Sequence, residues 1–350
     1  MNRAFYRPAW GRAAWLLAAC TVACRPAVEP VRLSETRRLM GVPWTITLHA
    51  PEAATGRAAA AAAFAEVARL EGLLSDYDPA SELSRLSAAA PTATPMPVSD
   101  DVWRVLAEAV AFREASGGAF DPTVGPLTTL WRQARRSGRM PRPDKLAAAR
   151  AAVGPEALHL VPADRAVLLP RPGTRLDLGG IGMGFAADRA LEVLARHGIA
   201  AAMIDASGDV VVSGPPPGAA GWRILPDPLG SGRPDAAPLL LAHAAVTTSG
   251  DAFQAVEIDG IRYGHIVDPR TGMAVVGPAA VTVIAADGTT ADALATAASV
   301  LGPEAGAALV GRFPGAAARF TRVVAGRVES STTPTWPAQL AGPPGPLGRP

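Results

Sequence analysis

A hairpin, a strand and a helix follow one another in the last third of the chain, and this order restricts the fold most. Two short strands are predicted over 255–258 and 261–267, separated by Asp259-Gly260. That dipeptide predicts a two-residue hairpin turn, because both of its central residues need positive φ angles. A third strand is predicted over 281–285, and an alanine-rich helix follows it to about Leu301. This mixture favours an α+β fold.

The rest of the chain agrees with this fold class. A strand is predicted over 44–48, followed by a long helix over 57–74, and a further helix is predicted over 98–116. Strands over 210–212 and 222–225 flank a loop rich in proline. We expect mixed sheets with packed helices in two lobes, and a ligand site between the lobes.

Oxygen-bearing side chains at the start of the predicted C-terminal helix suggest a metal site. Asp292 and Thr296 are four residues apart, so both project from one helix face, where they could hold a hard cation such as Mg²⁺. His265 ends a predicted strand and could act as a base, which together indicates metal-assisted phosphate chemistry. A simpler alternative is that Thr289 and Asp292 form a capping box, so that Asp292 only caps the start of its helix.

A glycine-rich turn lies upstream. A short apolar strand is predicted over 176–178, followed by the turn and by a helix over 185–197. Such a turn lets backbone N–H groups approach a pyrophosphate. Asp205 ends the next strand, roughly twenty residues after the glycines, as a dinucleotide-binding fingerprint requires. The spacing is G-G-x-G-x-G rather than G-x-G-x-x-G, so the turn could equally be a tight connection without a ligand.

With these motifs in order, the chain resembles the FAD:protein FMN transferases, the ApbE family. The resemblance covers nearly all of the chain between about residues 36 and 325, and its most specific strings are G-A-F-D-P-T-V-G-P-L and H-I-V-D-P-R-T-G. The matching stretches are Met40-Gly41, Leu74 to Pro79, Ser81 to Arg85, Gly118 to Leu127, Leu176 to Asp188, Ser207 to Asp209, Thr248 to Asp251, His265 to Gly272 and Ala291 to Thr296.

The resemblance implies a specific reaction. Members bind FAD and a divalent cation, cleave the pyrophosphate and transfer FMN through a phosphoester to a Thr or Ser hydroxyl of an acceptor protein, releasing AMP. The acceptor would be a subunit of a respiratory membrane complex. Mg²⁺ would neutralise the phosphates and stabilise the charge that develops on AMP. The ligand types do not distinguish Mg²⁺ from Mn²⁺.

The resemblance also assigns residues. The positions that match FAD contacts are Met40, Tyr77, Ala119, Phe120, Asp121, Asp177, Met183 and His265. Asp292 and Thr296 match the metal-binding positions, with the backbone of Gly180 as a further candidate. His265 would also be the general base for the acceptor hydroxyl, because an imidazole has a pKa near working pH.

Two positions depart from the family pattern. Many relatives carry lysine where this chain has Met183, and Lys145 is the only lysine in the sequence. Methionine cannot donate a hydrogen bond to a phosphate, so we expect an effect on FAD affinity more than on activity. Ala206-Ser207 also stands where relatives more often have L-G or A-G.

The N-terminus predicts export and lipidation. Basic residues precede the short apolar run 13–19, and Leu17-Ala18-Ala19-Cys20 has the pattern of a bacterial lipoprotein signal, with Cys20 as the lipidated residue. Cys24 is a competing site, and an ordinary cleaved signal is a further alternative. The apolar run is far below the ~20 residues that span a bilayer. We expect a protein that is lipid-anchored in the bacterial cell envelope and faces the periplasm.

This prediction gives a domain plan. A signal peptide occupies 1–19, a tether 20–35 and the transferase domain 36–330, and a Pro/Gly-rich disordered tail follows over 331–350. Cys20 and Cys24 are the only cysteines, so the mature domain has no internal disulfide and no thiol metal site.

Charge and motif content leave few alternative functions. A net charge of +2 gives no basic surface for nucleic acid. The local basic run is interpreted as the solvated face of a helix and loop, and it contains Arg132, Arg135, Arg136, Arg139 and Arg142. Two other functions compete with the transferase: a periplasmic FAD-binding lipoprotein with at most slow FAD pyrophosphatase activity, and an NAD-type oxidoreductase that rests only on the glycine turn and Asp205.

Overall fold

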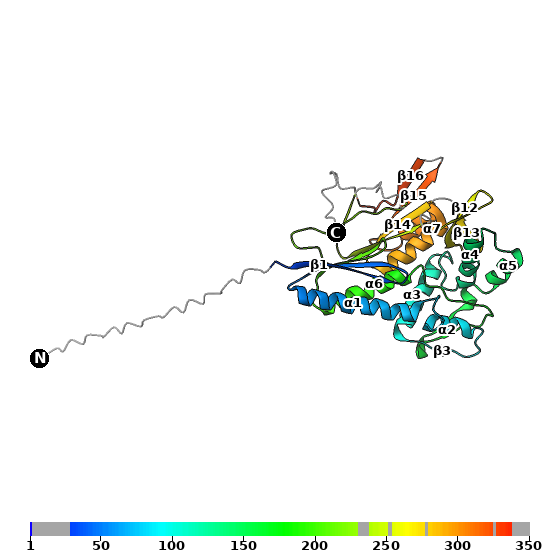
Figure 1. Cartoon of the computed structure of the whole chain (residues 1–350), viewed down its shortest axis with the longest axis horizontal. Helices are drawn as coiled ribbons and strands as arrows, with labels where there is room; N and C mark the ends of the chain where they lie inside the picture. Colours follow the sequence, from blue (N-terminus) through cyan, green and yellow to red (C-terminus); the bar gives the residue numbers. More distant parts are fainter. Residues whose placement is uncertain (2–28, 230–237, 251–253, 277–278, 325–326, 338–350) are drawn as a thin grey trace.

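An eight-stranded antiparallel sheet forms the centre of the computed structural model, which describes Met1 and residues 29–229, 238–250, 254–276, 279–324 and 327–337 (Figure 1). The strand order is β1-β2-β6-β7-β10-β14-β15-β16. The bounds are β1 (Val31–Leu39), β2 (Val42–Ala50), β6 (Ala201–Ala206), β7 (Asp209–Val212), β10 (Ala244–Gly250), β14 (Ala279–Ala285), β15 (Ala317–Val324) and β16 (Arg327–Thr332).

Three helices cover one face of this sheet: α1 (Ala53–Leu74), α6 (Gly182–Arg196) and α7 (Gly288–Val310). The sequence of α1 shows why it packs there. Ala59, Ala63, Val67, Leu70 and Leu74 recur at helical spacing and are all buried. Burying this apolar stripe against the sheet and α6 gives the main hydrophobic core.

The opposite face of the sheet has a separate, smaller core. Strand β6 shows the alternation, because Ala202 and Ile204 belong to the helix side while Ala201 and Met203 pack on the other side. The hairpin of β8 (Trp222–Ile224) and β9 (Leu239–Leu241) covers that second side, together with Trp336. The sheet therefore has helices on one face and a hairpin on the other.

The remaining elements lie outside the main sheet. They are α2 (Glu82–Ala89), α3 (Asp100–Ala115), α4 (Gly125–Ser137), α5 (Pro143–Ala151), the small sheet of β3 (Met96–Pro97), β4 (His159–Val161) and β5 (Ala166–Leu168), and the small sheet of β11 (Val256–Ile258), β12 (Ile261–Val267) and β13 (Ala274–Val276). A third hydrophobic cluster joins α4 and α5 to β12, with Trp131 and Tyr263 in tilted ring contact at 5.1 Å.

The predicted α+β class is confirmed, and so is the predicted hairpin. Asp259 and Gly260 have φ angles of 52° and 75°, as a two-residue turn between β11 and β12 requires. Helix α7 runs past the predicted end at Leu301. A kink separates the two parts, because Gly302 is non-helical with φ 77° and Pro303 follows it.

The predicted strand over 176–178 is wrong. These residues form no strand, and α6 begins at Gly182, three residues earlier than predicted. Strand β6, which follows α6, pairs antiparallel with both of its neighbours, β2 and β7. A dinucleotide-binding unit needs parallel strands joined by a helix, so the fold does not support the NAD-type interpretation.

Part of the segment expected to be a disordered tail packs against the domain. Residues 327–332 form β16, and the hydroxyl of Thr335 donates to the carbonyl of Ala316 at 2.8 Å. The remainder of the tail, 338–350, and the predicted lipidation site Cys20 lie outside the described residues.

Helix α7 is the one described helix whose length and apolar character would suit a membrane span. It packs on β10 and β14 inside the main core. Its hydropathy is therefore that of a core helix.

Candidate active site at the starts of two helices

Helices α6 and α7 meet at their first turns, where two glycines are in contact. A Cβ atom on Gly288 would lie 2.7 Å from the carbonyl oxygen of Gly184, and a Cβ on Gly184 would lie 2.9 Å from the backbone nitrogen of Thr289. Neither position has room for a side chain. The contact lets side chains from one helix reach backbone N–H groups at the start of the other.

Asp292 makes such a contact from α7 to α6. Its buried carboxylate accepts a hydrogen bond from the backbone N–H of Gly184 at 3.1 Å. Burial raises its pKa to about 7. Within the described ranges, no arginine, lysine or histidine forms an ion pair with this carboxylate. A buried acid without a cationic side chain is a suitable ligand for a metal ion.

The capping-box alternative for Asp292 does not hold. Asp287 is the N-cap of α7, and its carboxylate accepts from the backbone N–H of Thr290 at 2.7 Å. Asp292 accepts from the other helix instead. Its carboxylate is therefore not needed to begin α7.

Thr296 of α7 lies against the backbone of Gly180 in the glycine-rich turn. A Cβ on Gly180 would lie 2.8 Å from the hydroxyl oxygen of Thr296, so the backbone of the glycine-rich turn runs directly past this hydroxyl. The Ser249 hydroxyl of β10 lies 3.3 Å from it. Among the described residues no three acidic, histidine or cysteine side chains cluster as a metal site. A cation held here would take hydroxyl and backbone oxygens beside Asp292, a donor set that fits Mg²⁺ or Mn²⁺.

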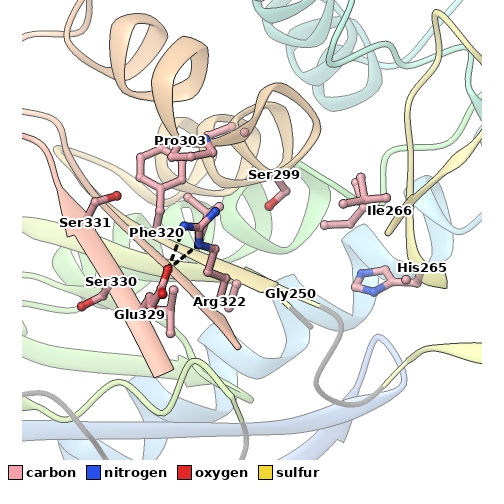
Figure 2. Close-up of a pocket in the computed structure, with 17 residues that line it drawn as sticks. Gly250, His265, Ile266, Ser299, Pro303, Phe320, Arg322, Glu329, Ser330 and Ser331 are labelled. Atoms are coloured by element: carbon pink, nitrogen blue, oxygen red, sulfur yellow. Dashed lines mark hydrogen bonds and ion pairs between the residues drawn. The ribbon is translucent and has the colours of Figure 1, made fainter. Parts of the chain in front are cut away.

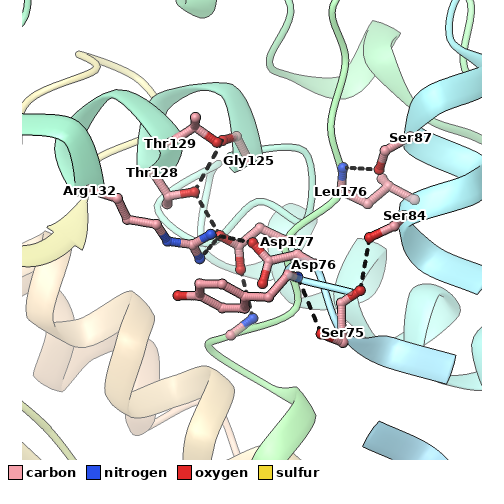
Figure 3. A network of polar contacts seen from close by, with 12 residues as sticks. Ser75, Asp76, Ser84, Ser87, Gly125, Thr128, Thr129, Arg132, Leu176 and Asp177 are labelled. Atoms are coloured by element: carbon pink, nitrogen blue, oxygen red, sulfur yellow. Dashed lines mark hydrogen bonds and ion pairs between the residues drawn. The ribbon is translucent and has the colours of Figure 1, made fainter. Parts of the chain in front are cut away.

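Asp177 anchors a polar network beside the same turn (Figure 3). One carboxylate oxygen accepts from the Thr128 hydroxyl at 2.7 Å and from the Arg132 guanidinium at 3.1 Å. The other oxygen accepts from the backbone N–H of Gly179 at 2.8 Å. Asp177 thereby ties α4 to the residues that lead into Gly180.

The interpretation of the basic run as a solvated face is wrong for Arg132. Its guanidinium is largely buried and forms ion pairs with both Asp76 and Asp177, which lie in different loops. It also stacks over the ring of Tyr77, 4.3 Å from the ring centroid. Burial and the charge of Asp177 raise the pKa of Asp76. Arg136, Arg139 and Arg142 are exposed as expected.

The predicted FAD contacts differ in how available their side chains are. Tyr77 is 75% exposed, on the loop after α1. Ala119, Phe120 and Asp121 are buried, and Asp121 accepts from the N–H and hydroxyl of Thr123 at 2.8 and 2.6 Å. Met40, at the β1–β2 turn with φ 49°, packs against the main core. A ligand would reach residues 119–121 through their backbone.

His265 lies on β12 at one end of a mainly apolar cavity of about 240 Å³ (Figure 2). Gly250, Ile266, Ser299 and Phe320 also line this cavity. Ser299 is three residues beyond Thr296 on α7, and Gly250 follows Ser249. His265 therefore faces the part of α7 that follows the predicted cation ligands.

The turn after β12 is fixed by α4. The indole N–H of Trp131 donates to the carbonyl of Gly272 at 2.9 Å. Gly272 has φ 79°, and a Cβ there would meet the side chain of Arg150 at 3.0 Å. This bond joins α4, which begins with the G-P-L motif, to the D-P-R-T-G turn 141 residues further along the chain.

Comparisons with known proteins identify the family of the chain. The family model described as "ApbE family" matches residues 40–320. The chain belongs to the ApbE family. It is 36% identical to the FAD:protein FMN transferase of Treponema pallidum over 77% of this chain and 78% of that protein. It is 30% identical to the FAD:protein FMN transferase of Klebsiella pneumoniae over 87% and 89%.

A solved structure shows the same fold. The apo form of the flavinyl transferase ApbE from Pseudomonas stutzeri superposes with a TM-score of 0.78, at 29% identity, covering 88% of this chain and 96% of that chain. The flavin transferase ApbE from Vibrio cholerae gives 0.76 at 26% identity, covering 88% and 98%.

Met183, the departure from the common lysine of ApbE members, lies in the first turn of α6. Its half-buried side chain packs against the main core, and its backbone N–H points at Asp292. The position therefore adjoins the predicted cation ligand.

Two acids near the helix starts were not assigned a role from the sequence. Asp188 of α6 accepts hydrogen bonds from the first turn of α7. Asp209 follows a tight turn in which Ser207 and Gly208 have φ angles of 60° and 104°. Burial and the charge of Asp292 raise the pKa of Asp209 well above the usual range. Asp188 and Asp209 both lie in stretches that match the family, and this match was the sequence signal that could have identified them.

Proposed function

We propose that this chain is a divalent-cation-dependent transferase that attaches FMN from FAD to a Thr or Ser hydroxyl of an acceptor protein. Membership of the ApbE family supports the reaction. The observation that carries the site is that two side chains of α7 reach the segment 180–184, Asp292 at the backbone N–H of Gly184 and Thr296 at the backbone of Gly180. Their oxygens suit Mg²⁺, which when bound would supply charge neutralisation at the pyrophosphate.

The residues of the chain have separate tasks in this reaction. The acceptor hydroxyl oxygen bonds to the FMN phosphorus while the bond from that phosphorus to the bridging oxygen breaks, and AMP leaves with the electron pair. His265 accepts the hydroxyl proton in its role as general base. The first N–H groups of α6 already donate to Asp292 and to Leu178, so this helix start would favour negative charge on the phosphates through its dipole alone.

The loop residues hold FAD in place. The exposed ring of Tyr77 has the Arg132 guanidinium stacked on one of its faces. Ion pairs with Asp76 and Asp177 hold that guanidinium in place. A ring held in this way can pack against a planar group of FAD at little entropic cost.

A direct assay tests this function. Purified protein is incubated with FAD, Mg²⁺ and a respiratory subunit carrying the flavinylation motif, and the gel is inspected for flavin fluorescence on the acceptor. Fluorescence with one AMP released per flavin supports transfer. Release of free FMN and AMP without labelling of the acceptor would instead support an FAD-binding lipoprotein with pyrophosphatase activity.

Asp292→Asn tests the cation ligand in the same assay. The amide oxygen can still accept from Gly184, so the helix contact is kept while the charge is lost. We expect cation-dependent AMP release to disappear with folding intact. Full activity of the Asn variant would show that the carboxylate does not hold the cation.

We also propose that the protein is lipidated at Cys20 and held in the cell envelope, facing the periplasm. The support is the Leu17-Ala18-Ala19-Cys20 string. Cys20→Ala should leave the precursor uncleaved or release the protein from membranes, with Cys24→Ala as the matched control. Normal processing of Cys20→Ala together with loss of processing in Cys24→Ala would move the site to Cys24.

A further inference from the structure

Asp188 makes three hydrogen bonds to the first turn of α7, although it belongs to α6. One carboxylate oxygen accepts from the backbone N–H of Gly288 at 2.7 Å. The other accepts from the backbone N–H and the hydroxyl of Thr289, at 2.8 and 2.6 Å. The first N–H groups of a helix have no acceptor inside that helix, so Asp188 accepts hydrogen bonds from donors that would otherwise lack a partner within α7.

The bonds run in both directions between the two helices. Asp292 of α7 accepts from Gly184 at the start of α6, while Asp188 of α6 accepts from Gly288 and Thr289 at the start of α7. Each helix thus caps the other across the glycine contact. We call Asp188, Asp292, Gly184, Gly288 and Thr289 the helix clasp.

The helix clasp joins the two halves of the predicted cation site. Gly180 lies just before α6, whereas Asp292 and Thr296 belong to α7. The relative position of their oxygens therefore depends on how α7 is seated against α6. Mg²⁺ demands near-octahedral geometry at about 2.0–2.1 Å, so displacements of about 0.5 Å reduce its binding.

We propose that Asp188 is a positioning residue for the cation site, acting by seating the start of α7 against α6. The proposal rests on the cation site of the proposed function. Asp188 forms no hydrogen bond with Asp292 or Thr296, and its three hydrogen-bond partners are all donors at the helix start. Its charge does act on Asp292, whose pKa is raised by burial and by this charge, so Asp287→Asn is needed as a control for the loss of charge.

The set of partners explains why a carboxylate is needed. In Asp188→Asn one acceptor oxygen becomes an NH₂ donor that would face the N–H of Gly288 or Thr289. At least one hydrogen bond is then lost, and the new NH₂ group faces a backbone N–H in a partly buried site, where two donors oppose each other. Asp287→Asn is the matched control, because Asp287 caps the same helix start and loses the same charge. Asparagine caps as well as aspartate, so that control keeps its bond.

Binding of Mn²⁺, followed by electron paramagnetic resonance on the full-length protein, tests the proposal without relying on activity. We expect Asp188→Asn to weaken Mn²⁺ binding about tenfold, equivalent to about 1.4 kcal/mol, and Asp287→Asn to change it by less than about twofold. Affinity for FAD without cation should change little in either variant. Equal Mn²⁺ affinity of Asp188→Asn and wild type would overturn the proposal, even if thermal stability falls.

Two further outcomes keep the test decisive. If wild type binds no Mn²⁺, the proposed cation site fails, and Asp188 as its positioning residue fails with it. If Asp188→Asn does not fold, Thr289→Val and Thr289→Ser replace it, because only the serine variant keeps the hydroxyl that donates to Asp188. Weaker Mn²⁺ binding in Thr289→Val than in Thr289→Ser supports the proposal, and equal binding contradicts it.

Discussion

The backbone of Gly184 lies directly against the backbone of Gly288, which brings the first turns of α6 and α7 together. A Cβ at Gly288 would also lie 3.0 Å from the carboxylate of Asp188. Cβ atoms in proteins do not approach backbone as closely as this contact would require. The two glycines are therefore needed for packing, rather than for a left-handed conformation, since neither has a positive φ.

Gly184→Ala should separate the two helices, whereas Gly182→Ala should not. A Cβ at Gly182 would be 3.8 Å from its nearest neighbour, the Cβ of Leu178, which is ordinary contact. We expect Gly184→Ala to lower the free energy of unfolding by about 1–3 kcal/mol through overpacking. Gly182→Ala should be neutral or slightly stabilising, because alanine favours helix. Chemical denaturation measures both, and wild-type stability of Gly184→Ala would contradict the contact.

The stability of the cation-free protein should fall as pH rises through the titration of Asp188. Burial raises the pKa of this carboxyl from 3.8 to about 6 in the folded state. The folded protein then binds more protons than the unfolded chain between about pH 4 and pH 6, so protonation stabilises the fold there. This contribution is present below pH 4 and is lost as pH rises through about 6.

Denaturation in a chelating buffer at several pH values measures this dependence. Asp188→Asn, which does not titrate, should have a shallower fall over the same range than wild type. Asp287→Asn serves as the control that keeps the titrating group. Parallel pH profiles for wild type and Asp188→Asn would show that Asp188 titrates normally.

Sequence patterns predicted local structure better than the contacts between distant segments. The Asp259-Gly260 turn follows from the φ angles that those residues tolerate, so it could be read directly. The short run 176–178 could not be distinguished from a strand, because its hydrogen-bond partners, Pro122 and Ser87, are distant in sequence. Gly302-Pro303 would normally end a helix, but a second helical segment follows the kink and runs to Val310.

The site was predicted in part for the same reason. The spacing of Asp292 and Thr296 suggested a shared ligand, but their meeting with Gly180 depends on tertiary packing. Arg132 was interpreted as solvated because its acidic partners, Asp76 and Asp177, lie 56 and 45 residues away. Charge runs indicate solvent exposure only when no distant partner exists.

Arg132→Gln should destabilise the fold, and Arg136→Gln on the same helix should not. Removing the guanidinium leaves the largely buried carboxylates of Asp76 and Asp177 without their shared cation. We expect a loss of about 1–3 kcal/mol in the free energy of unfolding, discounted for partial solvent access, and weaker FAD binding because Tyr77 loses its support. Arg136 is exposed, so its variant should match wild type in denaturation and FAD titration. Equal behaviour of the two variants would mean that the network does not position Tyr77.

Met183→Lys should tighten FAD binding modestly. Met183 stands in the first turn of α6, half-buried, with its backbone N–H directed at Asp292. A lysine there could offer an ammonium to an FAD phosphate, which methionine cannot. Because Met183 is half-buried, we expect a partly screened charge contact, worth roughly 1 kcal/mol or less, rather than a desolvated one worth about 1.5–3 kcal/mol. At ~1.4 kcal/mol per decade, the gain should therefore stay below about tenfold.

Fluorescence quenching of FAD separates charge from shape at this position if Met183→Leu is titrated beside Met183→Lys. The leucine variant should bind FAD like wild type, because it keeps an apolar side chain of similar volume. The gain in the lysine variant should shrink as salt is added, since a partly exposed charge contact is screened. Transfer rate should change less than affinity, because His265 and the cation ligands are unaltered. Loss of FAD binding in Met183→Lys would instead show that the methionine packs in a pocket with no room for an ammonium, and position 183 would then no longer count as an FAD contact.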